Sequence, residues 1–246
     1  MKQYNFQSVI DEVANEYGVS RDVICEVAEG IMRSGIMEFF GGIETDVFLR
    51  NGDLKVILFK EEEIVELGIN DLKKGVIKGL IAKLRKDLRK KCEEEIIWGV
   101  YRKFKGKIKE LVKGKVIHFN GSEYYVEFLD EFGKKFIGIC NKADMPYSGR
   151  DRWREWKLKG EERYFGVKNV LVEDAFGFLR LKIMLTRQSK FVVEKLFRLF
   201  GYSGCIYEIK RVPYKVKVWV EERVPREVIR SVARELDEEV IVRYGR

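Results

Sequence analysis

LTRQSKFVVEKLFRLF, residues 185–200, decides how this chain is organised. Upstream of it, residues 178–186 alternate between apolar and polar positions, which predicts a β-strand. Downstream, apolar residues recur at helical spacing over residues 192–200, which predicts an amphipathic helix. Only the short basic turn at residues 187–190 separates the two. We therefore expect a strand that closes one domain and a helix that begins the next, with no spacer between them.

The composition is that of a globular protein. Its 246 residues suffice for two or three small domains, and 46% hydrophobic residues with 13% aromatics can fill their cores. Charge interrupts every apolar run well before the roughly 18 residues of a membrane span, and the start has no signal-peptide core. We expect a cytoplasmic protein with no membrane partner. High charge content, 36% of residues, with only 3 prolines favours a heat-adapted source.

Charge is divided unevenly along the chain. Residues 1–66 contain 6 Lys and Arg against 14 Asp and Glu, a net charge of −8, and the remainder contains 42 against 26, a net charge of +16. The basic part carries aromatic residues among its cations, which is typical of nucleic-acid binding, whereas an acidic segment suits a basic protein surface. An ordinary solvated charged surface is the alternative, and a segregation of this size disfavours it.

The first hundred residues predict a helical head with a β-hairpin. One helix is expected around residues 6–17, and a second begins after Ser20 as N-cap and ends at the glycine pair 41–42. Two short strands follow on either side of the Asn-Gly pair at 51–52, which suits a tight hairpin turn.

A long helix is expected from near residue 70 to residue 104. Its apolar residues recur at every fourth position: Leu72, Val76, Leu80, Leu84, Leu88, Cys92, Ile96, Val100 and Phe104. Because a helix turns about 100° per residue, such a stripe drifts by roughly 40° at each step. The helix is then buried on different sides at its two ends, as a connector between domains would be. A regular core helix with a frayed end is the alternative.

From residue 105 the pattern changes to period two. Five strand candidates in about 80 residues, separated by Gly, Asn and Asp, favour a closed barrel of the OB type. After the helix at 190–200 come two strands around Pro213, a helix that begins at Pro225 and a last strand, in the order αββαβ. The fold class expected is α+β with several domains.

No motif for catalysis or cofactor binding is present. The chain has no phosphate-binding glycine loop, no nucleophile elbow and a single histidine, so we expect neither an enzyme nor a cofactor. The four cysteines are scattered and suit small buried side chains better than disulfides or metal ligands. Three acidic residues at 61–63 could serve a metal-dependent nuclease, but consecutive side chains point in different directions. A solvated charge run explains them better.

This order of elements, together with the LTRQSK junction, resembles the NusA family of bacterial transcription factors. The resemblance implies a head with connector helix over residues 1–104, an S-one-type OB barrel over 105–188 and a degenerate KH-like domain over 189–246. It implies that the head binds RNA polymerase and the barrel binds single-stranded nascent RNA. The protein would then modulate pausing, termination or antitermination, with other transcription factors as further partners. The alternative is a stand-alone RNA-binding module in ribosome biogenesis or translation.

In the barrel, the resemblance places stacking rings around the turn between the first two strands. Phe119, Tyr124 and Tyr125 are the candidates there, and Asn141 stands where the family often has a stacking histidine. Since neighbours on a strand point opposite ways, one of the two tyrosines must face the core. Further family-like positions near the final hairpin are Asp174 and Arg180.

The insertion at residues 150–165 is the densest mixture of cations and aromatics. Arg152 and Trp153 are candidates for a second RNA platform in it. Equally, Trp153 and Trp156 could close the open end of the barrel.

The KH-like domain lacks the usual Gly-x-x-Gly clamp on nucleic acid. The tetrapeptide at residues 201–204 has this pattern but follows the first helix, so it is better interpreted as a helix C-cap. Residues 221–224 leave no room for a clamp at the family position. The remaining candidates are sequence-independent phosphate contacts: Lys215, Lys217, Arg226 and Arg230.

The polymerase-binding candidates lie on the second helix of the head. Glu26 and Glu29 supply acidic charge, and Met37, Phe39 and Phe40 form an apolar run near the helix end. An apolar anchor within a negative rim favours a basic protein surface over phosphate.

Overall fold

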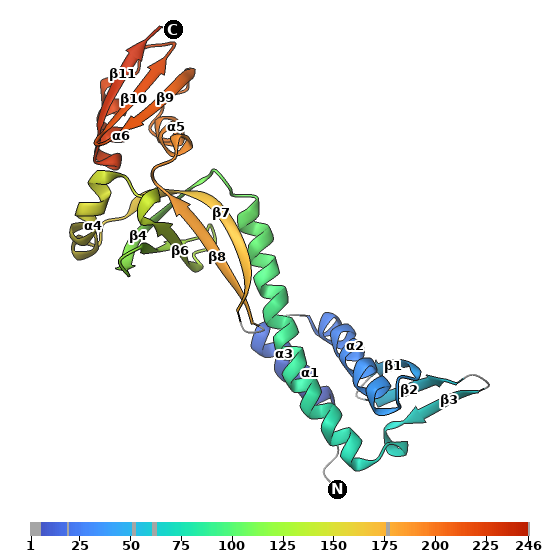
Figure 1. The fold of residues 1–246 in the computed structure, drawn as a ribbon. Helices are drawn as coiled ribbons and strands as arrows, with labels where there is room; N and C mark the ends of the chain where they lie inside the picture. Colours follow the sequence, from blue (N-terminus) through green and yellow to red (C-terminus); the bar gives the residue numbers. More distant parts are fainter. Residues whose placement is uncertain (1–5, 19, 51–52, 61–62, 176–177, 246) are drawn as a thin grey trace. The chain divides into compact units, whose positions relative to one another are not determined.

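A computed structural model describes residues 6–18, 20–50, 53–60, 63–175 and 178–245 (Figure 1). The described chain is α+β with three sheets, one of which is a closed five-stranded barrel. It divides into two compact units, Met1–Ile96 and Ile97–Arg246.

The amino-terminal unit combines helices with an antiparallel sheet of order β1-β2-β3. Its elements are α1 (Phe6–Tyr17), α2 (Arg21–Phe39), β1 (Glu44–Arg50), β2 (Asp53–Phe59), β3 (Ile64–Gly68), the short 3-10 helix η1 (Ile69–Asp71) and the start of α3 (Lys74–Lys105). The expected hairpin is confirmed, although its turn residues Asn51 and Gly52 lie outside the described residues. Strand β3 was not expected. Glu61 and Glu62 also lie outside the described residues.

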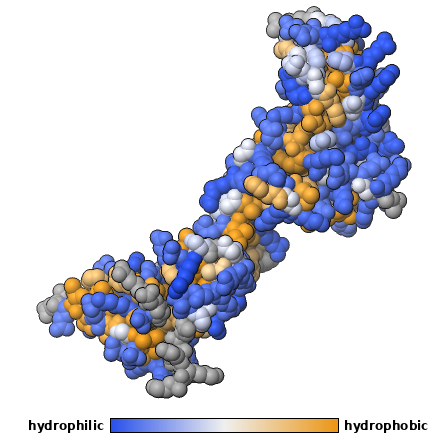
Figure 2. Space-filling model, turned by 180° about the vertical axis from the view of Figure 1, so that it is seen from behind, coloured by the Kyte–Doolittle hydropathy of each residue, from blue (hydrophilic) through white to orange (hydrophobic). Residues whose placement is uncertain are grey.

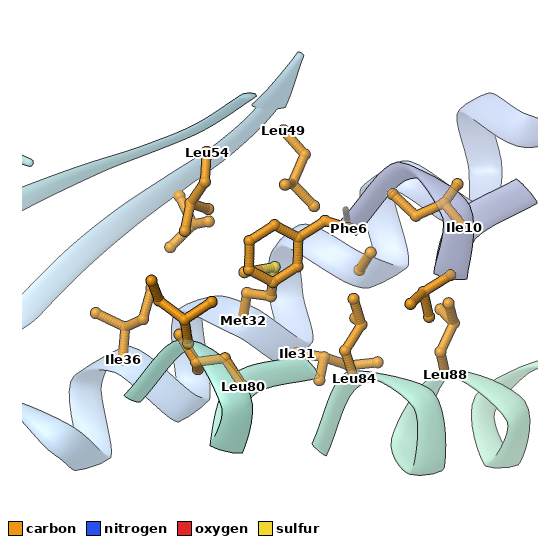
Figure 3. Close-up of a cluster of buried hydrophobic side chains, with 14 of the residues drawn as sticks. Phe6, Ile10, Ile31, Met32, Ile36, Leu49, Leu54, Leu80, Leu84 and Leu88 are labelled. Atoms are coloured by element: carbon orange, nitrogen blue, oxygen red, sulfur yellow. The ribbon is translucent and has the colours of Figure 1, made fainter. Parts of the chain in front are cut away.

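Three layers of this unit share one core. Figure 3 shows Phe6 and Ile10 of α1 pointing toward Leu84 and Leu88 of α3, with Met32 of α2 beside them. The N-cap position of Ser20 is confirmed, but its side chain makes no capping hydrogen bond. Gly41 and Gly42, with φ of 74° and 91°, end α2 as expected, because positive φ costs glycine little.

The apolar stripe of helix α3 is buried in different cores at its two ends. Leu80, Leu84 and Leu88 are buried in the core of the amino-terminal unit, whereas Phe104 is buried in the core of the following unit. Between these ends, Ile96 is 38% exposed. The two ends of α3 are thus buried against different cores, as predicted.

The second unit begins with the closed barrel, whose strand order is β4-β5-β6-β8-β7. The elements are β4 (Leu111–Phe119), β5 (Glu123–Leu129), β6 (Lys135–Asn141), the 3-10 helix η2 (Lys142–Asp144), α4 (Tyr147–Lys159), β7 (Arg163–Ala175) and β8 (Phe178–Thr186). All neighbouring strands are antiparallel except β6 and β8, which are parallel. A Cβ at Gly138 would lie 2.4 Å from Leu185 Cδ1, so a larger residue there would displace the Leu185 side chain.

The chain continues with α5 (Lys190–Leu199), β9 (Ile206–Val212), β10 (Lys215–Val220), α6 (Arg226–Leu236) and β11 (Glu239–Tyr244). The expected order αββαβ is confirmed. Strand β10 is central, antiparallel to β9 and parallel to β11. Its residues Val216, Val218 and Val220 are buried in one cluster with apolar residues of α5 and α6. The two helices therefore cover one face of this sheet.

The Gly-x-x-Gly tetrapeptide is a helix end, as expected. Gly201 has φ of 98° just after α5, and Tyr202 is buried. Arg198 Nη1 donates to the carbonyl oxygen of Gly204 at 2.7 Å. The described residues between β10 and α6 contain no helix, so a clamp at that position is absent there.

Buried ion pairs join the barrel to the module that follows it. Arg187 is fully buried, and its guanidinium donates to the Glu235 carboxylate at 3.0 Å, to the Glu235 carbonyl at 2.5 Å and to the Tyr164 carbonyl at 2.9 Å. Next to it, Arg211 pairs with Glu238 and donates to the Arg187 carbonyl at 2.5 Å. Burial raises the pKa of the Glu238 carboxyl. The junction is therefore an ordered part of the fold.

Candidate nucleic-acid interface

The outer side of strands β4, β5 and β8 carries a partly exposed aromatic residue. Tyr125 lies on β5, and its ring is 5.7 Å from the His118 ring on β4. Its hydroxyl donates to Glu123 Oε2 at 3.2 Å. We call the surface formed by His118, Glu123, Tyr125 and Lys182 the barrel face.

Lys182 joins this surface from β8. The pKa of its ammonium is raised, first by a hydrogen bond to Glu173 and further by the charges of Glu123 and Tyr125. Lys182 Nζ lies 2.7 Å from Glu173 Oε2. A cation beside a partly exposed ring suits a nucleotide, because the ring stacks on the base while the cation neutralises phosphate. Lys182 could have been predicted to face outward, because apolar and polar residues alternate along residues 178–186.

Tyr124 cannot serve as the stacking residue that the sequence suggested. It is 1% exposed, and its ring stacks on Phe119 at 4.3 Å between centroids. Trp153 of α4 completes this cluster at 5.4 Å from Phe119. The prediction of an RNA contact is therefore wrong for Tyr124, and both Phe119 and Trp153 pack against the barrel core.

Helix α4 packs on the barrel through its tryptophans. Trp156 is 2% exposed, which favours the alternative in which the tryptophans close the barrel. Arg152 is exposed, but it pairs with Asp237 at 3.1 Å and with Glu155 at 3.4 Å. This arginine therefore links α4 to the end of α6.

The remaining barrel candidates lie around the barrel face. Asn141 is half-buried at the end of β6, opposite Glu123 on β5. Arg180 is opposite Glu173 on the β7–β8 ribbon, and Asp174 is the next residue of β7. Arg180 precedes Lys182 by two positions on the same side of β8, or about 7 Å. Arg180 can therefore extend the cationic surface along β8.

The four phosphate contacts expected in the carboxy-terminal module divide between two faces. Lys215 and Lys217 lie on β10 and alternate with buried valines, so they face away from the helices. Arg226 and Arg230 lie on α6, which packs on the other side of the sheet. A single patch of all four is therefore excluded.

A tryptophan accompanies the two lysines on the open side. Trp219 alternates in the same phase as Lys215 and Lys217. Lys210 Nζ of β9 lies 5.9 Å from the Trp219 ring centroid, and Arg243 Cζ of β11 lies 5.6 Å from it. We call Lys210, Lys215, Lys217, Trp219 and Arg243 the sheet face. Sequence analysis missed Lys210 and Arg243 as partners because only strand register brings them to Trp219.

The candidates for polymerase binding lie at two places along α2. Glu26 and Glu29 line a hollow of about 480 Å³ that also includes Asp22 and Leu49. Phe39 is 53% exposed and lies about 15 Å further along the helix, at ten residues from Glu29. An apolar anchor inside one negative rim is therefore not what the fold presents.

Glu29 has a structural role as well. Its carboxylate accepts the backbone N–H of Leu49 at 2.8 Å, which ties α2 to β1. Glu26 is exposed. Of the two, Glu26 is the side chain available for a partner.

The apolar end of α2 borders a second hollow, of about 350 Å³, next to α3. Its lining includes Gly35, Phe39, Gly79 and Lys83. Phe40 contacts Phe39 edge-on at 5.1 Å and packs on the core, and Met37 is half-buried. Phe39 is thus the ring of this group that is exposed for a contact.

The two compact units also differ in net charge, but the first unit is less negative than residues 1–66 alone. Met1–Ile96 contains 15 Lys and Arg against 19 Asp and Glu, a net −4, and Ile97–Arg246 contains 33 against 21, a net +12. Residues 67–96, most of them in α3, account for the change, because they add 9 Lys and Arg against 5 Asp and Glu. One of these cations, Arg89, pairs with Glu12 and Glu16. The face shown in Figure 2 is largely hydrophilic, with apolar residues in smaller groups.

Across the described ranges, no helix combines the length and apolar composition needed to cross a bilayer. The same residues contain no grouping of His, Cys, Asp and Glu that could hold a metal ion. No model of a known protein family matches the chain, and no curated protein is significantly similar to it in sequence.

Proposed function

We propose that this protein binds single-stranded RNA through its barrel and a protein partner through its amino-terminal unit, as a transcription factor of the NusA type. The observation that carries the proposal is the barrel topology. The closed order β4-β5-β6-β8-β7, with a helix between the third and fourth strands, supports an OB barrel. OB barrels bind oligonucleotides on their second and third strands, which here are β5 and β6.

The barrel face fits this ligand. Tyr125 lies on the second strand and is partly exposed, and Lys182 on β8 is within electrostatic range of it. Arg180 lies two positions before Lys182 on the same side of β8. Stacking on aromatic rings, with cations along the backbone, binds single strands with little dependence on sequence. The net charge of +12 on the second unit adds attraction for phosphate.

The proposed carboxy-terminal module is a KH-like domain without its clamp, and the order αββαβ around a three-stranded sheet supports this. Its described residues lack a helix between β10 and α6. In the Gly-x-x-Gly tetrapeptide at residues 201–204, the carbonyl oxygen of Gly204 already accepts a hydrogen bond from Arg198. Phosphate contacts in this module are therefore expected to be weak and independent of sequence.

The partner proposed for the amino-terminal unit is RNA polymerase. Its surface presents the acidic hollow with Asp22 and Glu26, and separately the exposed Phe39. Acidic side chains suit a basic protein surface and repel RNA, and an exposed aromatic ring elsewhere on the same unit offers a separate contact. Regulation of pausing, termination or antitermination would follow from holding polymerase and transcript together.

Two substitutions in the full chain test the two parts of this proposal, RNA binding by the barrel and polymerase binding by the amino-terminal unit, and each serves as the control for the other. Tyr125→Ala should weaken binding to a labelled single-stranded RNA by about 1–3 kcal/mol, as expected for one stacking contact, without changing binding to polymerase from the same host. Phe39→Ala should do the reverse. Circular dichroism establishes that both variants are folded.

The outcomes separate the alternatives. RNA binding that depends on Tyr125, without any binding to polymerase, would favour the stand-alone RNA module in ribosome biogenesis or translation. No binding of the parent protein to single-stranded RNA would refute the proposal.

A further inference from the structure

The sheet face is the uncovered side of the three-stranded sheet β11-β10-β9. Helices α5 and α6 bury Val216, Val218 and Val220 on the other side. The opposite side chains of β10 are Lys215, Lys217 and Trp219, all exposed or partly exposed. Trp219 is partly exposed on the central strand of this uncovered side, so its ring is accessible to a ligand.

Two like charges face each other beside this ring. Lys217 of β10 is directly opposite Lys210 of β9 in the strand register. Like charges at such positions destabilise a sheet. The nearest carboxylate to Lys210 Nζ is that of Glu208 at 3.9 Å, and within the described residues Lys217 has no ion pair. An anionic ligand would relieve this repulsion.

The cations are also placed around the ring. Lys210 on β9 and Arg243 on β11 flank Trp219 from the two outer strands, at 5.9 Å and 5.6 Å from its centroid. Both side chains are long and exposed, so each can turn from the ring to a phosphate. The five residues of the sheet face contribute four positive charges, against Glu208 and Glu239 on the same side.

We propose that the sheet face is a second RNA site, in which one base of a single strand stacks on Trp219 while Lys210, Lys217 and Arg243 contact the flanking phosphates. The ligand class rests on the proposed function, but the site does not, since it lies on different strands from the barrel face. It also differs from simple phosphate neutralisation, because it includes a stacked base. Arg226 and Arg230 on α6 take no part in it.

The test uses the full chain carrying Tyr125→Ala, so that the barrel face is weakened, and a short oligouridylate as probe. In this background Trp219→Ala should lower the affinity by about 5-fold to 150-fold, the range of one stacking contact, whereas Trp219→Phe should keep most of it. Trp98→Ala is the matched control, because Trp98 is 38% exposed on α3. It should leave the affinity unchanged.

A second variant keeps the proposal testable where Trp219→Ala disturbs folding. Lys217→Met removes the like-charge pair, so the free protein should melt at the same or a higher temperature while RNA binding weakens and depends less on salt. A lysine with a merely structural role would show the opposite pattern.

The outcomes are distinct for the two sites. If the parent binds oligouridylate but both Trp219→Ala and Lys217→Met bind as well as the Tyr125→Ala background, the sheet face is refuted and the barrel proposal stands. If Tyr125→Ala alone removes all binding, the same conclusion follows. If the parent protein binds no RNA, both proposals fail together.

Discussion

Replacing Arg187 by methionine should loosen the link between the barrel and the module that follows it. Methionine keeps much of the buried volume, but it removes donors from the Glu235 carboxylate and from the carbonyl oxygens of Glu235 and Tyr164. It also removes a cation that lies 5.2 Å from the Trp156 ring centroid. Glu235 is 9% exposed, so its charge would remain buried, with the backbone N–H of Tyr164 at 2.7 Å and Arg163 Nη1 at 3.9 Å as its remaining partners.

The expected loss follows from this geometry. Removing one partner of a buried ion pair costs about 3–5 kcal/mol, because the other charge loses its nearest counter-charge. Arg163, at 3.9 Å from the Glu235 carboxylate, compensates this charge in part. For a unit of this size, each kcal/mol lowers the melting temperature by about 2–4 °C, so Arg187→Met should melt about 6–20 °C lower. Adding Glu235→Leu removes the stranded charge, and the double variant should recover part of the loss.

Urea unfolding followed by tryptophan fluorescence measures both variants, since Trp156 lies beside the substituted side chain. Glu155→Leu is the control, because its contact with Arg152 is exposed and should contribute no more than about 1 kcal/mol. A folded Arg187→Met variant that loses less than about 1 kcal/mol would show that Arg187 does not hold the junction. A double variant less stable than Arg187→Met would show that the stranded charge is not the cause.

Two further predictions concern the barrel. Gly138→Ala should destabilise it by about 1–3 kcal/mol in urea unfolding, because the new Cβ would overlap Leu185, whereas Gly99→Ala on α3 has open space and should stabilise by up to about 1 kcal/mol; equal effects would contradict the packing. The pKa of the Asp130 carboxyl is held below its usual range, first by its hydrogen bond from Lys103, so its contribution to stability is present above the unfolded pKa and lost as pH falls through the folded one. Lys103→Met should move the pKa of Asp130 upward in a carboxyl NMR titration, and an unmoved pKa would exclude this pair as the cause.

Patterns local in the sequence predicted the local structure well. The four-residue stripe of α3 anticipated burial in two different cores, since helix geometry alone fixes where each residue points. Alternation in strands likewise fixed that Tyr124 and Tyr125 point opposite ways. Strand β5 alternates without interruption, so Tyr124 lies on the buried side with Val126 and Phe128, and Tyr125 lies on the outer side with Glu127. Strand β3 was not predicted, because it follows a run of charged residues and neither of its faces is deeply buried.

Long-range partners could not be predicted. Sequence analysis placed Arg187 in a short basic turn and could not identify its partner, because Glu235 is 48 positions away. The sheet face likewise combines residues predictable from local alternation with residues that only the strand register brings together. YKVKVWV already places two lysines and Trp219 on one side, yet only register brings Lys210 and Arg243 beside the ring. Local sequence patterns thus predicted individual helices and strands, whereas the candidate sites depend on which strands and helices lie next to one another in the fold.

The buried junction at Arg187 bears on how the protein would respond to RNA length. Since the barrel strand passes into α5 without a spacer, the barrel face and the sheet face belong to one compact unit. An RNA long enough to reach both would meet the second surface at an effective concentration set by the fold, and avidity could exceed either separate affinity by about 10²–10⁴. A shorter RNA would bind one surface at a time. The protein would thereby discriminate strands by length without reading their sequence.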